Sequence, residues 1–508
     1  MEEPSSKELK DSLKATSLFG SIQVFNILIS ILRNKIVALL IGPIGVGIIT
    51  LYTSTINLIK SFTDFSLSLS AVREISIAFK SDDSSLFSYK TSVLLKLVWY
   101  TGFLGFIICL LGSPLWSKFS FGNYDYTIGF AVLSITLLLS QLQNGKNVIL
   151  QSTCNFKKLA LSGFFGNLIG LLTVIPIYYV LGIDGIVLSL LIISIVSYII
   201  IFVYASKVKF ERIRINKVSA YNEGKIMLCQ GVMLSLNFML SSLVFFILRI
   251  FINKQGGIEE LGIYSASYMI INTYIALVFQ SMGQEYYPRL SSLSSEKEKF
   301  CNAVNGQIYL SLILLGPLVL LFISFSDQLL LLLYSQKFVR ADLLMALSMV
   351  GVLFQAPSWC MGYVFLAKSD NKYFLFYETI SKLIKLFSDL SFYYFWGLSG
   401  LGISMIVSYF YYYLQCKMVC NRRYGLKISK NSQYMLLVYL IISLLLVVVL
   451  KYLTVQYRLV ISIIVILLSA YFSYIKLNSI LDFRALVYNK FFSKHGKASD
   501  NSNSQVPR

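Results

Sequence analysis

The stretch ILRNKIVALLIG, Ile31 to Gly42, places two cations inside a long apolar run. Arg33 and Lys35 follow the mostly apolar segment LFGSIQVFNILIS (18–30) and precede IVALLIG. A run of this length predicts a helix that crosses a bilayer, and a charged side chain at the centre of such a helix costs roughly 2.5–3.5 kcal/mol on insertion scales. Other residues of the chain must therefore provide surroundings in which these charges are tolerated.

Apolar composition extends over the whole chain. Of the 508 residues, 56% are hydrophobic and 13% are charged, and the mean hydropathy is +0.71. Soluble proteins carry about one quarter charged residues. Repeated apolar runs favour helices, because a helix satisfies its own backbone hydrogen bonds in lipid. We therefore predict an all-α polytopic membrane protein. The seven cysteines lack metal-ligand spacing, so no metal site is expected.

Fourteen membrane spans are predicted, separated by Gly, Pro or charged residues. Their approximate limits are 14–41, 44–68, 91–112, 126–146, 158–181, 185–204, 224–251, 261–284, 304–326, 341–366, 372–396, 399–418, 433–452 and 457–476. The spans divide the chain into an N-lobe (1–206), a basic cytoplasmic linker (207–222), a C-lobe (223–420), an added helix pair (421–480) and a cytoplasmic tail (481–508). The end of the tail is expected to be disordered.

The distribution of Lys and Arg predicts the orientation of the chain. If both termini are cytoplasmic, only six cations fall in outer segments: Lys118, Lys254, Lys337, Arg340, Lys451 and Arg458. Most of the 44 Lys and Arg residues then face the cytoplasm or lie in the spans, as the positive-inside rule requires. This topology also accounts for most of the net charge of +20, so no nucleic-acid partner is expected.

A duplication is visible around the opening stretch. The tripeptide ILR occurs at 31–33 and again at 247–249. Arg33 is followed by Arg73 at the same spacing at which Arg249 is followed by Arg289, so one offset along the chain relates both arginine pairs. We predict that spans 1–6 and 7–12 are parallel copies of one six-helix unit. Such paired bundles suit alternating access around a central cavity.

Charged side chains within the spans supply the candidate site. Glu378, Lys382, Lys385 and Asp389 form one helical stripe of two i,i+4 pairs, and Lys60 and Asp64 are expected to repeat that arrangement. In contrast, Arg33, Lys35 and Arg249 have no acidic neighbour at helical spacing. Two interpretations stay open. Either the pairs simply join helices, or the surplus of cations lines a wet cavity that receives a phosphate or pyrophosphate.

Amide side chains in the spans could bind sugar hydroxyls, because amides both donate and accept hydrogen bonds. They serve equally well as links between helices. The amide residues are Gln23, Asn26, Asn34, Asn57, Gln141, Gln143, Asn144, Asn237, Asn272, Gln280 and Gln355.

The chain resembles the multidrug/oligosaccharidyl-lipid/polysaccharide (MOP) exporter superfamily, and within it the Wzx-type O-antigen flippases. The resemblance rests on ILRNKIVALLIGPIGVG (31–47), AVREIS (71–76), YYPRLS (286–291) and LLYSQKF (332–338), with the fourteen spans and the repeat. It implies two bundles in a bacterial inner membrane that move undecaprenyl-pyrophosphate-linked oligosaccharide to the periplasmic leaflet. In the related lipid II flippases the position of Arg33 carries an essential cavity arginine, often followed by an acidic residue; here Asn34 follows.

The leading hypothesis is therefore a flippase without covalent chemistry or catalytic residues. Its substrate-binding cations would be Arg33, Lys35, Lys60, Arg249, Lys382 and Lys385. Supporting or ion-coupling roles would fall to Asn34, Asp64, Glu378 and Asp389. No cofactor is expected beyond a Na⁺ gradient, a H⁺ gradient or the membrane potential as driving force. The polymerase and glycosyltransferases of the same glycan pathway are candidate partners.

Two alternatives compete with the flippase. A cation-coupled multidrug exporter would need an acidic cavity, whereas the predicted one is positive. A membrane glycan polymerase or ligase would need a sizeable outer loop with catalytic residues, whereas the outer segments are short and the only histidine, His495, lies in the tail.

Overall fold

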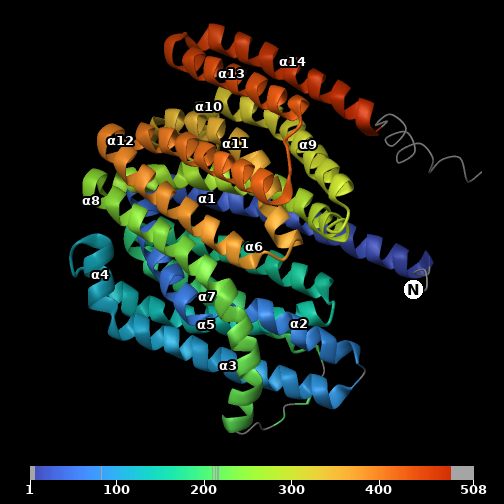
Figure 1. Cartoon of the computed structure of the whole chain (residues 1–508). Helices are drawn as coiled ribbons and strands as arrows, with labels where there is room; N and C mark the ends of the chain where they lie inside the picture. Colours follow the sequence, from blue (N-terminus) through green and yellow to red (C-terminus); the bar gives the residue numbers. More distant parts are fainter. Residues whose placement is uncertain (1–5, 82, 209, 212, 214–216, 482–508) are drawn as a thin grey trace, which may run out of the picture. The chain divides into compact units, whose positions relative to one another are not determined.

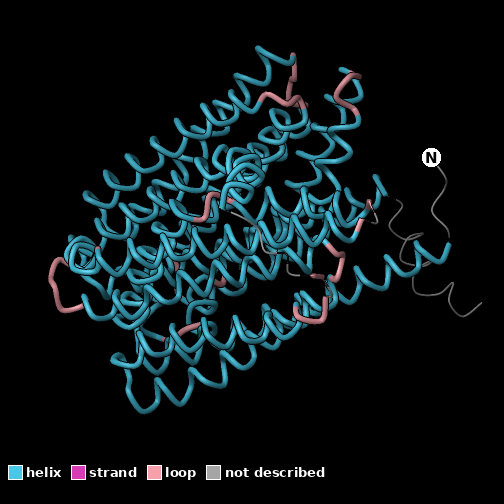
Figure 2. Tube along the Cα trace, turned by 90° about the horizontal axis from the view of Figure 1, so that it is seen from below, coloured by secondary structure: helices cyan, strands magenta, loops and turns pink. Residues whose placement is uncertain are grey.

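The computed structural model describes residues 6–81, 83–208, 210–211, 213 and 217–481. Residues 482–508, which include the end of the tail, and part of the predicted linker lie outside this description. The described residues form helices joined by short loops, with no strand among them (Figure 2). The all-α prediction is confirmed.

The helices follow one another along the chain in the order labelled in Figure 1. Their bounds are α1 (Ser6–Thr63), α2 (Leu67–Lys80), α3 (Ser84–Leu111), α4 (Ser113–Phe121), α5 (Thr127–Ser152), α6 (Phe156–Leu181), η1 (Gly182–Gly185), α7 (Ile186–Ala205), α8 (Lys217–Ser292), α9 (Lys297–Ser324), α10 (Ser326–Leu333), η2 (Gln336–Ala341), α11 (Asp342–Ala367), α12 (Asn371–Tyr424), α13 (Lys430–Tyr452) and α14 (Val455–Leu481).

Ten helical stretches among the described residues are long and apolar enough to cross a membrane, which makes the chain a multi-pass membrane protein. Four of these stretches are much longer than one crossing: Phe25–Thr63, Phe156–Ala205, Ser235–Ser292 and Asn371–Tyr424. If each of the four crosses twice, the described residues hold the fourteen predicted spans. That exact number stays a prediction.

A glycine with positive φ interrupts each of the four long stretches. Gly42 in α1 (φ 63°, ψ −170°) and Gly257 in α8 (φ 82°, ψ 173°) share one conformation. Gly182 (φ 57°, ψ −129°) and Gly397 in α12 (φ 58°, ψ −140°) share another. Side chains other than hydrogen strongly disfavour these angles, so glycine sets where each helix turns back. The two pairs have the same separation along the chain, which supports the predicted duplication.

Three short helices lie almost entirely outside the predicted spans. These are α2, α4 and α10, of 14, 9 and 8 residues. The second predicted span was expected to continue to residue 68, but α1 ends at Thr63. The chain then turns at Phe65 and Ser66, which have φ values of 49° and 45°, and α2 begins after this turn.

The chain forms two compact units, which are described separately. Unit 1 holds the described residues up to Met269, Asp327–Ala341 and Glu378–Leu398. In it α3 packs on α5, α5 on α7, and α6 on both α1 and α7, around buried side chains such as Tyr52 and Phe130.

Unit 2 holds Ile270–Ser326, Asp342–Tyr377 and the described residues from Ser399 onward. In it α9 packs against α11, α13 and α14. The predicted lobe boundaries, which follow the repeat rather than backbone contacts, stay predictions.

Inside unit 1 the glycine-containing breaks of α1 and α8 contact each other. A Cβ on Gly47 would lie 2.1 Å from the carbonyl oxygen of Ile258, and a Cβ on Gly262 would lie 1.9 Å from the carbonyl oxygen of Pro43. The contact is reciprocal, because the offset that relates Gly42 to Gly257 also relates Pro43 to Ile258 and Gly47 to Gly262. Glycine at both positions allows the two backbones to touch.

Candidate functional site

All six predicted substrate-binding cations belong to unit 1. Arg33, Lys35 and Lys60 lie on α1, Arg249 lies on α8 before Gly257, and Lys382 and Lys385 lie on α12. The structure thus gathers residues from both predicted lobes in one unit. The surroundings of the individual cations differ, and these differences decide which of them can receive an anion.

The stripe on α12 is internally compensated. Lys385 Nζ lies 2.6 Å from Asp389 Oδ2, and Asp389 is only 1% exposed. Lys382 Nζ lies 3.8 Å from Glu378 Oε2 and also donates hydrogen bonds to the backbone carbonyl and the side-chain oxygen of Asn237 on α8. Both predicted i,i+4 pairs therefore form, and a carboxylate already accompanies each lysine. This surrounding favours a structural role for the stripe.

Lys60 and Asp64 do not repeat this pairing. No salt bridge joins them in the described part of the chain, although the Asp64 backbone N–H still donates to the Lys60 carbonyl oxygen at 2.8 Å. Instead, Asp64 Oδ1 accepts a hydrogen bond of 2.9 Å from Gln141 Nε2 on α5, which also donates to Thr101 on α3 at 2.9 Å. The i,i+4 spacing is kept and Asp64 acts electrostatically on Lys60, but these two described side chains do not form the close ion pair seen on α12.

Three cations have only neutral partners among the described residues. Lys35 Nζ donates a 2.7 Å hydrogen bond to the carbonyl oxygen of Leu331 on α10. Arg33 is half-buried near the hydroxyl of Tyr178 on α6 and has no carboxylate in salt-bridge range. Arg249 lies 5.9 Å from the ring centroid of Phe245, and its Nε is buried without a hydrogen-bond acceptor.

Half-buried guanidinium groups without a carboxylate favour an anion from outside the protein. An uncompensated charge in a membrane span is costly, and an unsatisfied buried donor adds to that cost. A bound phosphate would supply the acceptors that the Arg249 Nε lacks and the negative charge that Arg33 lacks. Within the described residues, neighbouring Asn34 donates to the sulfur of Met269, at 3.5 Å.

Several amides of unit 1 join helices. Asn167 on α6 donates to Asn26 on α1 at 3.1 Å, Gln141 binds Asp64, and Asn237 binds Lys382. The described side chains of Asn272, Gln280 and Gln355, all in unit 2, make no hydrogen bond within the described part of the chain. Gln23 lies among the residues whose side chains are not described.

Sequence reasoning missed the burial of two cations. Lys146, which the sequence places at the cytoplasmic end of a predicted span, is 8% exposed in the interior of α5, with Nζ 5.3 Å from the ring centroid of Phe202. Arg458, assigned to an outer segment, is 7% exposed in α14. The apolar residues on both sides of Arg458, YRLVISIIV (457–465), are a signal that could have indicated burial.

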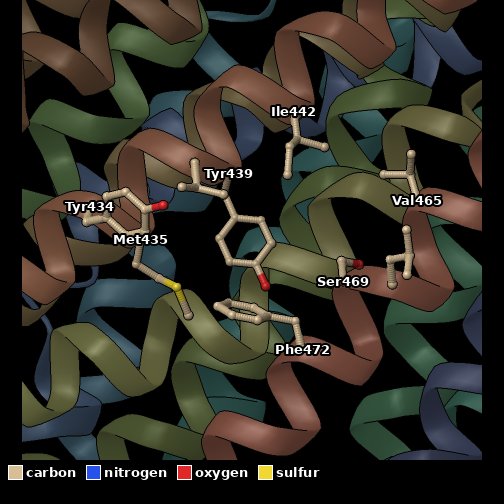
Figure 3. Close-up of a pocket in the computed structure, with 9 residues that line it drawn as sticks. Tyr434, Met435, Tyr439, Ile442, Val465, Ser469 and Phe472 are labelled. Atoms are coloured by element: carbon tan, nitrogen blue, oxygen red, sulfur yellow. The ribbon is translucent and has the colours of Figure 1, made fainter.

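Unit 2 contains a pocket between α13 and α14 with a volume of about 320 Å³ (Figure 3). Tyr434, Met435 and Tyr439 line it from α13, and Ser469 and Phe472 line it from α14. No charged side chain lines this pocket, so it lacks the chemistry to hold a phosphate.

Comparisons with known proteins agree with this fold. The sequence model of the family described as "polysaccharide biosynthesis protein" matches residues 36–343. No curated protein sequence matches the chain.

Three solved structures share the fold at low sequence identity. An inward-facing multidrug resistance MATE transporter of the MOP superfamily has a TM-score of 0.67 at 16% identity, covering 79% of this chain and 94% of its own. The lipid II flippase MurJ, in an inward closed conformation, has a TM-score of 0.64 at 16% identity, covering 91% and 99%.

The third is a MOP superfamily transporter from Pyrococcus furiosus, described as having a binding pocket of reverse polarity. Its TM-score is 0.58 at 15% identity, and the match covers 81% of this chain and 96% of its own. The chain therefore belongs to the polysaccharide biosynthesis protein family and has the fold of the MOP superfamily transporters.

Proposed function

We propose that this protein is a flippase that moves an undecaprenyl-pyrophosphate-linked oligosaccharide, such as an O-antigen or capsule repeat unit, across the bacterial inner membrane. It would do so by alternating access, with both termini in the cytoplasm and without covalent chemistry. Membership of the polysaccharide biosynthesis protein family supports a glycan-related substrate.

The observation that carries the proposal is the pair of arginines at corresponding positions, Arg33 and Arg249. Each lies in a membrane-spanning stretch of unit 1 and has no carboxylate partner among the described residues. A guanidinium can hold two phosphate oxygens at once, and a pyrophosphate offers enough oxygens for more than one such group. Lys35 donates one hydrogen bond to the carbonyl oxygen of Leu331 and supplies a further point charge.

The α12 lysines take a different place in this proposal than in the prediction from sequence. Because Lys382 and Lys385 are accompanied by Glu378 and Asp389, they contribute little net positive charge. Lys382 links α12 to Asn237 on α8, Lys385 pairs with Asp389 within α12, and the anion binds at the arginines.

The glycine contact in unit 1 supports alternating access. Gly47 and Gly262 follow breaks at the predicted outer ends of spans 1 and 7, and their backbones touch. Parts of the two predicted lobes therefore meet at their predicted outer ends, as expected of a conformation closed toward the periplasm. Opening that contact would release the glycan outward.

The test is complementation of a deletion strain. Arg33→Ala and Arg249→Ala should abolish surface polysaccharide while the protein still accumulates in the membrane. Lys254→Ala, which removes an exposed cation from the outer segment, is the matched control and should restore surface polysaccharide. Full complementation by both arginine variants would overturn the assignment. Loss of resistance to cationic drugs in the deletion strain, with normal surface polysaccharide, would favour the multidrug exporter.

A further inference from the structure

An aromatic cluster in unit 2 joins α8 to α11 around Gly283. A Cβ on Gly283 would lie 3.0 Å from the Tyr363 hydroxyl and 3.2 Å from the Trp359 ring, so the absence of a side chain there lets both rings approach α8 closely. The ring centroids of Trp359 and Tyr363 are 4.9 Å apart, and those of Tyr287 and Tyr363 are 5.7 Å apart. Next to these rings, fully buried Tyr286 donates to the carbonyl oxygen of Cys360 at 3.0 Å, which links the two helices.

The part of this cluster formed by Tyr287, Trp359 and Tyr363 is accessible. Tyr287 is 42% exposed, and Trp359 and Tyr363 are half-buried. In the part of the chain that the structure describes, the Tyr287 hydroxyl, the Tyr363 hydroxyl and the Trp359 indole N–H have no hydrogen-bond partner. Buried Tyr and Trp polar tips normally find one. These three tips therefore remain available to a polar ligand.

Two amides lie on the same helix faces as the rings. Gln280, Gly283 and Tyr287 have spacings of three and four on α8, and Gln355, Trp359 and Tyr363 have spacings of four on α11. Gln280 is exposed and Gln355 is half-buried, and neither makes a hydrogen bond to another described residue. The structure thus combines apolar ring faces with free amides and hydroxyls on two adjacent helices.

This surface is not suited to lipid contact. Asn272, Thr273 and Gln280 are exposed on the same part of α8, inside a candidate membrane span, and their side chains have no hydrogen-bond partner among the described residues. Unsatisfied polar groups facing hydrocarbon cost several kcal/mol each, so this face of α8 borders a hydrated space. No cation of the candidate anion site belongs to the cluster, and its ring faces and neutral donors do not select a phosphate.

We infer that the surface formed by Gln280, Tyr287, Gln355, Trp359 and Tyr363 binds the sugar moiety of the lipid-linked substrate. A pyranose ring offers an apolar C–H face to an aromatic ring and hydroxyls at its rim to amides, which donate and accept in the same plane. The inference rests on the proposed function. It adds the surface by which the protein distinguishes a lipid that carries sugar from polyprenyl pyrophosphate without sugar. In the predicted topology the surface lies toward the cytoplasmic ends of its two spans, where the glycan enters.

The test measures binding of two lipids to the purified full chain in lipid nanodiscs. One is undecaprenyl pyrophosphate, and the other is the polyprenyl-pyrophosphate oligosaccharide extracted from the source strain. Wild type should bind the glycan-bearing lipid more tightly. Tyr287→Ala and Gln355→Ala should weaken that binding about tenfold, equivalent to ~1.4 kcal/mol, and leave undecaprenyl pyrophosphate binding unchanged. Tyr452→Ala, which removes a 73% exposed tyrosine elsewhere in unit 2, is the control and should match wild type.

The possible failures are separable. If Tyr287→Ala and Gln355→Ala bind the glycan-bearing lipid as wild type does, the sugar surface is wrong while the proposed function stands. Equally weakened binding of both lipids would also overturn the sugar surface, because these residues would then bind the part that the two lipids share. If wild type binds neither lipid, the proposed function itself fails.

Discussion

Gly262 touches Gly47 so closely that a Cβ on Gly262 would lie 3.0 Å from the Gly47 backbone nitrogen. The atoms that such a Cβ would meet belong to the backbone and cannot rotate away as a side chain can. The two breaks, which follow the first span of each predicted copy, thus contact each other inside unit 1.

Gly47→Ala and Gly262→Ala should each destabilise the protein. The new methyl group would lie about 2 Å from a carbonyl oxygen, so the helices must separate, and overpacking of this kind costs roughly 1–3 kcal/mol. The thermal unfolding midpoint of the purified protein in detergent measures the effect. Gly306→Ala is the matched control, because a Cβ there meets nothing within 4 Å. An unchanged midpoint in both contact variants would show that the backbones are not in contact.

The Lys385–Asp389 pair should behave as a structural pair. Asp389→Asn should lower the free energy of unfolding by up to roughly 3–5 kcal/mol, because it leaves the half-buried lysine charge without its carboxylate. The double variant Lys385→Met with Asp389→Leu should recover most of that loss and should retain surface polysaccharide. If the double variant is stable but transport is abolished, the pair takes part in substrate binding or ion coupling.

Asp370 should give the protein an acid-sensitive contact. Its carboxylate, just before α12, accepts from Arg423 Nε at 3.0 Å and from the Tyr424 hydroxyl at 2.5 Å, and these bonds hold the pKa of Asp370 below its ordinary value of 3.8. Because the pKa of Asp370 is lower in the folded state, its contact contributes fully to stability above pH 3.8. This contribution is lost as the pH falls through the folded-state pKa.

The thermal midpoint of wild type should therefore fall more steeply than that of Asp370→Asn as the pH is lowered from about 6 to about 3. Parallel curves for the two proteins would show that the contact between Asp370 and Arg423 contributes nothing measurable.

Much of the fold could be predicted from the sequence because apolar run length and glycine position are local signals. Every predicted span lies largely on helix, and the breaks at Gly42 and Gly257 fall where the sequence placed them. The short helices α2 and α4 were not predicted, since they are neither long nor apolar enough to resemble a span. The end of α1 at Thr63 was not predicted either.

The candidate site could be predicted only in part. Spacing within one helix correctly indicated the two pairs on α12, because both partners share a helix. It could not reveal that Asp64 binds Gln141 or that Lys382 binds Asn237, which are contacts between helices. The aromatic cluster could not be predicted for the same reason, because Trp359 approaches α8 only where Gly283, in a different helix, leaves room for it.

Transbilayer movement of a labelled polyprenyl-pyrophosphate glycan, in proteoliposomes containing the purified protein, tests anion binding at the two arginines without other cellular components. We expect wild type to move the lipid, and Arg422→Gln, which alters an exposed cation, to move it at the same rate. In Arg33→Gln and Arg249→Gln the rate should fall about tenfold or more, because a hydrogen bond to a charged group contributes ~1.5–3 kcal/mol. Equal rates in wild type and in both arginine variants would show that the arginines do not bind the moving lipid.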